Sequence, residues 1–210
     1  IGNDTYVVDS TTDKPVETAG AGIDTVESSI AFSLAGREVE NLTLTGSAGI
    51  AATGNQYANL LLGNSGANAI NGAAGADRME GKGGNDTYTV DNAGDVVIEA
   101  GGEGADQIQS SVSYTLTAGQ EIEFLTLTSS ATLSATGNEF ANTLRGNGNA
   151  NRLDGGKGAD LMEGGRGNDT FIVDNVGDRV VERYGEGTDL VISSVSFSLV
   201  GQNADNVTLT

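Results

Sequence analysis

The chain has 210 residues, including 32 glycines, one proline and no cysteine or histidine, and 5% of its residues are aromatic. Its 29 acidic and 10 basic residues give a net charge of −19, which disfavours nucleic acid and anionic membranes as partners and favours multivalent cations. Without His or Cys there is no Ser-His-Asp or Cys-His arrangement, usual zinc site or disulfide, so no enzyme activity is expected.

In chain order, the sequence repeats one unit two and a half times. GNDTYVVD begins at Gly2, GNDTYTVD at Gly84 and GNDTFIVD at Gly167. This predicts repeat units at residues 2–83 and 84–166 and a partial third unit at 167–210, together one continuous solenoid. Because the chain starts and stops inside units, we expect it to belong to a longer run or to associate end to end with identical subunits.

Each unit contains a nine-residue word, clearest in GGKGADLME from Gly155 and GGRGNDTFI from Gly164. Both read G-G-x-G-x-D-x-U-x, where U is a large apolar residue. Glycines at positions 1, 2 and 4 permit backbone angles that other residues avoid, which predicts a tight turn with inward carbonyls. Positions 6 and 8 share one parity on the following strand, so the Asp should face the turn and the apolar residue the core.

Two words laid end to end make one coil, and stacking places position-6 residues of successive coils directly above one another. Their oxygens suit Ca2+, whereas Mg2+ needs shorter bonds and strict octahedral geometry. The predicted aspartate ligands are Asp4, Asp13, Asp24, Asp77, Asp86, Asp95, Asp106, Asp160, Asp169, Asp178 and Asp189. The predicted glycine contributors are Gly75, Gly84, Gly104, Gly156, Gly158, Gly165, Gly167 and Gly187. Weaker, uncharged candidates are Asn59, Asn68, Asn142 and Asn151.

Neighbours in this series form five Asp-Asp and four Asn-Asp pairs, which predicts about five to nine bound Ca2+ ions. A less specific interpretation is that a position-6 residue only closes its turn by hydrogen bonding, as Asx residues do. A second is that glycine-rich acidic sequence forms a flexible, disordered tract, which becomes the leading interpretation when calcium is absent.

The double word from Gly155 resembles the calcium-binding nonapeptide of the RTX (haemolysin-type) family of secreted bacterial repeat proteins. The resemblance implies an all-β fold, a right-handed parallel β-roll or β-helix solenoid with Ca2+ between successive turns. It also implies export by a one-step, type I secretion apparatus and folding on reaching external calcium. Tyr57 and Phe140 replace the glycine at position 4, and Ala73 and Lys82 the glycine at position 2, so these turns depart from the family word.

The segments Ser28–Thr53 and Ser110–Thr136 lack the word but alternate as strands do, which predicts further β-helical coils without metal. The sequence leaves open whether these coils keep the length of two words or widen. The aromatic residues Tyr6, Tyr88 and Phe171 recur in phase and are expected to fill the core.

The predicted function is that of a secreted, calcium-dependent structural or assembly module of a surface layer, adhesin or extracellular fibre. The alternative is a non-catalytic appendage of a secreted enzyme such as a polysaccharide-modifying enzyme, protease or lipase. Flanking sequence would separate the two: a catalytic domain favours the second and many further units favour the first. Expected partners are calcium, neighbouring repeats or identical subunits, and a candidate cell-surface polysaccharide. The sequence has no apolar run long enough to insert into a membrane.

Overall fold

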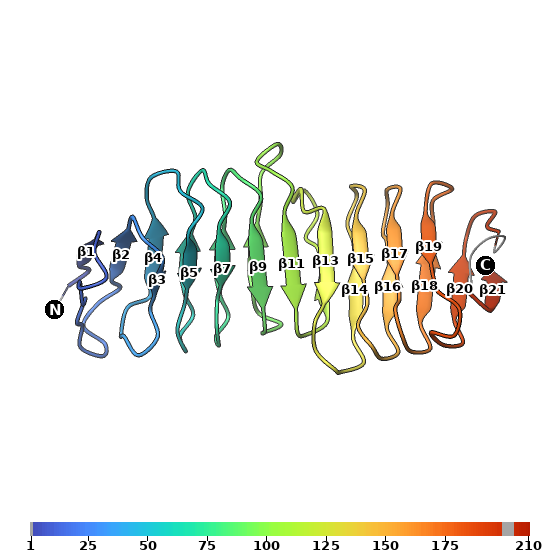
Figure 1. The fold of residues 1–210 in the computed structure, drawn as a ribbon, viewed down its shortest axis with the longest axis horizontal. Coiled ribbons are helices and arrows are strands. Elements are labelled where there is room, and N and C mark those ends of the chain that lie inside the picture. Colours follow the sequence, from blue (N-terminus) through green and yellow to red (C-terminus); the bar gives the residue numbers. More distant parts are fainter. Residues whose placement is uncertain (1, 199–203) are drawn as a thin grey trace. The chain divides into compact units, whose positions relative to one another are not determined.

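The structure, a computed structural model, describes residues 2–198 and 204–210, and every regular element in these ranges is a β-strand (Figure 1). The chain divides into two compact units, residues 1–106 and 107–210. The repeat boundaries predicted at residues 84 and 167 fall inside these units and remain a prediction. The described residues contain no helix that is long and apolar enough to cross a membrane.

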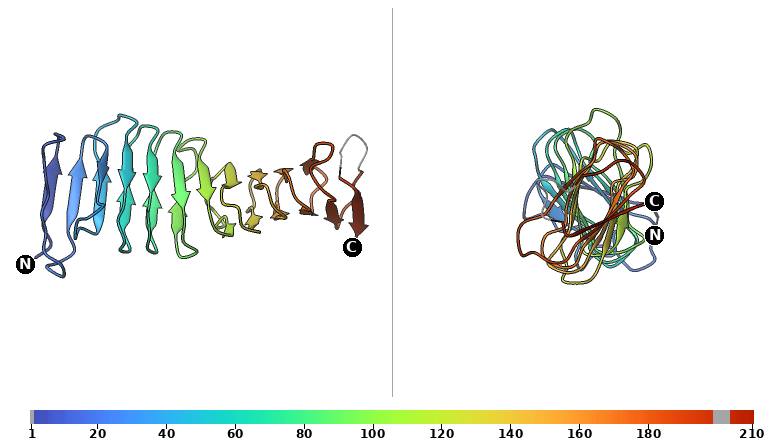
Figure 2. Two further views of the ribbon diagram at one scale, coloured as in Figure 1. Left: turned by 60° about the horizontal axis from the view of Figure 1, so that its bottom comes forward. Right: turned by 90° about the vertical axis from the view of Figure 1, so that its right-hand side faces the viewer.

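The first unit is built from ten strands in two parallel sheets. One sheet has the order β1-β2-β4-β6-β8-β10, and the other contains β3, β5, β7 and β9. Figure 2 shows these strands side by side with the connecting turns along both edges. The strands are β1 (Thr5–Val8), β2 (Thr25–Ser28), β3 (Phe32–Ser33), β4 (Asn41–Leu44), β5 (Ala51–Thr53), β6 (Leu60–Leu62), β7 (Ala69–Asn71), β8 (Arg78–Glu80), β9 (Thr87–Val90) and β10 (Val96–Ile98).

The second unit repeats this plan, with eleven strands among its described residues. One sheet contains β11, β13, β15, β17 and β19, and the other has the order β12-β14-β16-β18-β20-β21. The strands are β11 (Gln107–Ser110), β12 (Tyr114–Thr115), β13 (Phe124–Leu127), β14 (Ser134–Thr136), β15 (Thr143–Arg145), β16 (Arg152–Asp154), β17 (Leu161–Glu163), β18 (Thr170–Val173), β19 (Arg179–Val181), β20 (Leu190–Ser193) and β21 (Asn206–Leu209). The predicted all-β parallel solenoid is therefore confirmed.

The core of each unit consists of inward-facing apolar residues, both those at position 8 of the words and matching residues of the segments without the word, such as Leu42 and Leu125. Along each strand, buried and more exposed residues alternate. In β6, for example, the middle residue Leu61 is fully buried while both its neighbours are partly exposed. Residues in register stack into continuous columns, which keep apolar surface out of water along the whole unit. These columns are Val26, Leu42, Leu61, Met79 and Val97 in the first unit, and Ile108, Leu125, Leu144, Met162 and Val180 in the second.

The coil length is constant only where nonapeptides follow one another. Leu61 lies opposite Met79 and Leu144 opposite Met162, an interval of two words in both pairs. The segments without the word form coils as predicted, but their length varies. Thr25 pairs with Asn41 over a shorter interval, and Tyr114 pairs with Ala135 over a longer one. The regular word therefore fixes the coil length, and the segments between runs of words absorb insertions.

Candidate metal centre

The turns bring together the two residues of each of the nine predicted position-6 pairs. In each pair the backbone N–H of the earlier residue donates a hydrogen bond to Oδ1 of the later Asp, at 2.6–3.0 Å. One oxygen of each of these carboxylates thus ties one coil to the next. The pairs are 4/24, 77/95, 86/106, 160/178 and 169/189 for Asp-Asp, and 59/77, 68/86, 142/160 and 151/169 for Asn-Asp.

The second carboxylate oxygen distinguishes the aspartates. In five of them Oδ2 is buried and has no hydrogen-bond partner, and each side chain is only 1% exposed. A buried anionic oxygen without a hydrogen-bond donor is unfavourable, so each of these oxygens needs a cation or a proton as its partner. These aspartates are Asp24, Asp77, Asp86, Asp160 and Asp169, and each of the five predicted Asp-Asp pairs contributes one of them.

The glycines of the word have two different physical roles. In the words that begin at Gly72, Gly81, Gly155 and Gly164, the backbone at positions 2 and 4 is left-handed, with φ of 136° at Gly75 and 133° at Gly158. The same conformation was predicted at position 1, and there the prediction is wrong, because Gly81 and Gly164 do not have positive φ. A Cβ at these positions would instead collide with Oδ2 of the Asp in the same word. Position 1 is glycine because the carboxylate needs the space.

Two of the remaining predicted glycines, Gly104 and Gly187, lie where one turn closely approaches the turn before it. A Cβ on Gly104 would collide with the carbonyl oxygen of Gly84, and one on Gly187 with that of Gly167. These carbonyls therefore face the following turn, and their role as cation ligands stays a prediction. Positive φ is found at Gly84, Gly156, Gly165 and Gly167, and also at Ala73 and Lys82, which replace glycine at position 2 of their words.

Where position 6 is Asn, the amide is engaged within the chain. Asn59 accepts the N–H of Asn55 at Oδ1 (2.8 Å), and its Nδ2 donates to the carbonyl of Glu40 (3.0 Å). Asn68, Asn142 and Asn151 repeat this arrangement. The asparagine at position 2 of these words was missed, although G-N-x-x-x-N recurs in the sequence; it donates to carbonyls of the preceding coil at Asn55, Asn64, Asn138 and Asn147.

Asp13, Asp95 and Asp178 use Oδ2 to close their own turns. Asp95 accepts the N–H groups of Asp91 and Asn92, both at 3.2 Å, and Asp178 accepts two equivalent N–H groups at 3.1 and 3.0 Å. Asp13 does the same for Asp9 and Ser10. These three residues are therefore held as turn residues, with fewer oxygen lone pairs left for a cation than the five described above.

A glutamate that the sequence did not predict joins the aspartates. Three groups place one carboxylate oxygen of each member within 4.8 Å of the others: Asp4, Glu17 and Asp24; Asp86, Glu99 and Asp106; and Asp169, Glu182 and Asp189. The sequence contained a signal for this glutamate, because in each group a Glu, at residue 17, 99 or 182, precedes the later Asp of the group. In the last two groups all three side chains are buried.

The electrostatics of these sites fit a cation. Burial raises the pKa of Asp77 and Asp160 to about 7 and that of Asp86 and Asp169 to about 6. The three ion pairs described in the structure join Arg78, Arg145 and Arg152 to Glu80, Glu163 and Asp154 on the surface, and none includes the four aspartates above. Buried carboxylates without a positive partner, beside inward backbone carbonyls, form the hard oxygen set that Ca2+ prefers.

Protons and metal should therefore compete for these groups. Because the folded-state pKa values lie above the ordinary value of 3.8, the metal-free fold is most stable below about pH 4 and loses stability as the pH rises through about 6 to 7. We expect circular dichroism of the metal-free chain to show more β-structure at pH 4.5 than at pH 8. A β signal that stays constant or increases towards pH 8 would contradict the burial of these carboxylates.

Comparison with protein families gives an independent indication of the same chemistry. The family model described as RTX calcium-binding nonapeptide repeat (4 copies) matches residues 53–88 and 136–171, about a third of the chain. These ranges contain Asp77, Asp86, Asp160 and Asp169, four of the five aspartates whose Oδ2 has no hydrogen-bond partner. No curated protein matches the chain. Each of the two compact units of the chain thus contains one segment that matches the RTX calcium-binding nonapeptide repeat.

Proposed function

We propose that the chain is a calcium-dependent structural module that folds when Ca2+ binds between successive turns. The observation that carries this proposal is the set of five buried Oδ2 atoms without hydrogen-bond partners, one in each Asp-Asp pair. A bound cation would supply the positive charge that these carboxylates lack, and removing it would leave buried charges uncompensated.

The site chemistry favours a structural role over a catalytic one. The carboxylates form a series along the turns, at intervals of 18 to 20 residues, and are not gathered into one pocket. Each site joins two coils, so its natural effect is to hold the solenoid together. A setting outside the cell suits this role, because RTX repeats are typical of secreted bacterial proteins and millimolar-range sites are characteristic of extracellular modules.

The ion count tests this proposal. We expect isothermal titration calorimetry to give about five Ca2+ per chain in the tighter phase, one for each Asp-Asp pair. Any further ions should bind more weakly, since the asparagine amides are already hydrogen-bonded. Five ions change the net charge from −19 to about −9. A count of one or two ions would exclude a series of sites.

We further propose that the folded module associates with copies of itself. β1 and β21 are the outermost strands of their sheets, so each offers backbone groups on one side to another strand. We expect sedimentation at tens of micromolar protein to show oligomers in millimolar calcium and smaller species after chelation. A monodisperse monomer in calcium would contradict assembly but leave calcium-dependent folding intact.

A further inference from the structure

The Asp-Glu-Asp groups differ from the other paired sites in the length of their turn. Asp169 and Asp189 are 20 residues apart, whereas Asp160 and Asp178 are 18 apart. Glu182 follows β19 directly, at the place where a nonapeptide would begin with glycine. The longer turn thus accompanies a carboxylate in place of the position-1 glycine.

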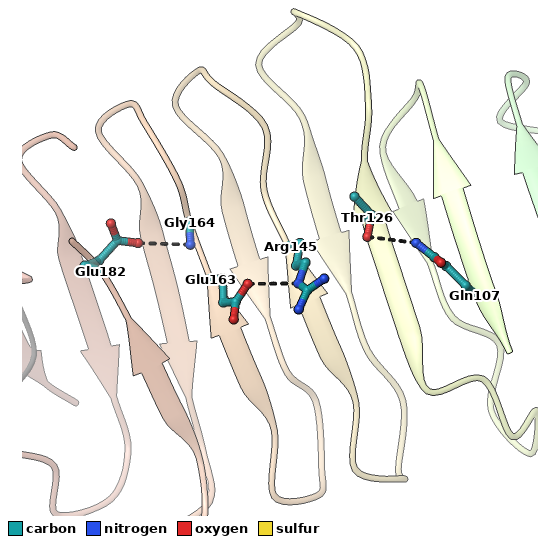
Figure 3. A network of polar contacts seen from close by, with 6 residues as sticks. All are labelled: Gln107, Thr126, Arg145, Glu163, Gly164 and Glu182. Atoms are coloured by element: carbon teal, nitrogen blue, oxygen red, sulfur yellow. Dashed lines mark hydrogen bonds and ion pairs between the residues drawn. The ribbon is translucent and has the colours of Figure 1, made fainter. Parts of the chain in front are cut away.

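Glu182 points into the solenoid, whereas Glu163 of the preceding coil does not. Glu182 is 5% exposed, and its carboxylate accepts the N–H of Gly164 at 2.9 Å (Figure 3). Glu163, the residue before Gly164, instead forms a surface ion pair with Arg145 at 2.8 Å (Figure 3). The same residue type is therefore present on the outside of one coil and on the inside of the next.

The inward Glu faces an oxygen that has no partner. A Cβ added to Gly164 would collide with both Oε1 of Glu182 and Oδ2 of Asp169, so these two oxygens flank one point. Asp169 is 1% exposed and its Oδ2 makes no hydrogen bond. Two buried carboxylate oxygens directed at one point repel each other unless a cation or a proton lies between them.

We propose that Glu99 and Glu182 each complete a three-carboxylate calcium site, which binds Ca2+ more tightly than the Asp-Asp pairs 77/95 and 160/178. This inference rests on the proposed calcium-dependent function and assigns specific residues to its strongest sites. Three carboxylates give a charge of −3, and affinity for Ca2+ increases with the charge of the ligand set. The third group, Asp4, Glu17 and Asp24, is more open, since Asp4 is exposed and Glu17 half-buried, and should bind more weakly.

The two buried groups differ by one hydroxyl. The Tyr88 hydroxyl contacts the Glu99 carboxylate, whereas the corresponding residue near Glu182 is Phe171. Both rings are fully buried. Tb3+ replaces Ca2+ in oxygen sites and emits when a nearby tyrosine is excited. Its emission should therefore report on the Glu99 group and not on the Glu182 group.

Calcium titration of matched variants tests the affinity. We expect Glu182→Gln to lower the affinity for one Ca2+ ion at least about tenfold, because the amide keeps an acceptor for Gly164 N–H but removes the charge. Glu99→Gln should lower the affinity for one Ca2+ ion in the same way, and the double variant should lower it for two. Glu163→Gln removes an equal charge on the surface and should titrate as the unchanged chain. Equal affinities for Glu182→Gln and Glu163→Gln would overturn the inference.

Terbium luminescence tests the location and does not depend on the folding of the glutamine variants. Tyr88→Phe should lower the tyrosine-excited emission, and Phe171→Tyr should raise it by placing a phenol beside the Glu182 group. Emission that neither substitution changes would place the ions away from both groups and overturn the inference. If the unchanged chain binds no calcium, the proposed function fails as well; if it binds about five ions that Glu182→Gln leaves unaltered, only the three-carboxylate sites are excluded.

Discussion

In millimolar calcium the chain is expected to show the circular dichroism of a β-solenoid, and in excess chelator at pH 7.5 it is expected to lose that signal. Without the ion, 29 acidic residues repel one another against only 10 basic ones, and ordering 32 glycines costs more entropy than ordering other residues. The buried aspartates add a direct penalty, because Asp77 and Asp86 would carry uncompensated charge in the core. Folding should occur at roughly 0.1–1 mM calcium, the range of extracellular modules.

Magnesium provides the control for this experiment. At the same concentration Mg2+ contributes equal ionic strength and charge, but it retains its waters and fits carboxylate and carbonyl oxygens less well. We expect it to restore little of the β signal. A chain that is fully folded in chelator at pH 7.5, or equally folded by Mg2+, would show that calcium is not the folding ligand.

The second large effect is expected for Asp169→Asn. This substitution keeps an Oδ1 acceptor for the Asn151 N–H, now at 2.7 Å, and almost the same volume, but it removes the charge. Asp169 takes part in the pair with Asn151, the pair with Asp189 and the group with Glu182, so the change weakens more than one contact with the ion. We expect the calcium concentration at the folding midpoint to increase at least about tenfold.

Two controls separate the charge at the site from charge in general. Glu27→Gln removes an exposed carboxylate from β2, outside every group described above, and should leave the calcium midpoint within about twofold. Asn151→Asp tests the reverse change, because it adds a carboxylate where the amide is now hydrogen-bonded. If Asp169→Asn and Glu27→Gln had equal midpoints, position 6 would be a turn residue only.

Much of the fold could be predicted because the repeating word constrains every coil in the same way. A nine-residue period, with an apolar residue at position 8, permits only one face of each strand to be buried, and Met162 and Phe171 lie there as expected. The same phase predicted which aspartates become neighbours, since stacking at one strand spacing converts a sequence interval into contact. Their assignment as calcium ligands stays a prediction.

The sequence by itself therefore determined the parallel β-solenoid, its core columns and the pairing of residues at position 6. Only the tertiary structure decided how those residues are used. Asp178 and Asp169 occupy the same position in the word, yet Asp178 closes its turn with Oδ2 and Asp169 leaves Oδ2 buried without a partner. Glu182 stands where the next word would begin with glycine, and it joins Asp169 because its side chain is buried on the same inner face as Val180. Burial and hydrogen-bond partners arise from contacts between coils, so a pattern within one coil cannot specify them.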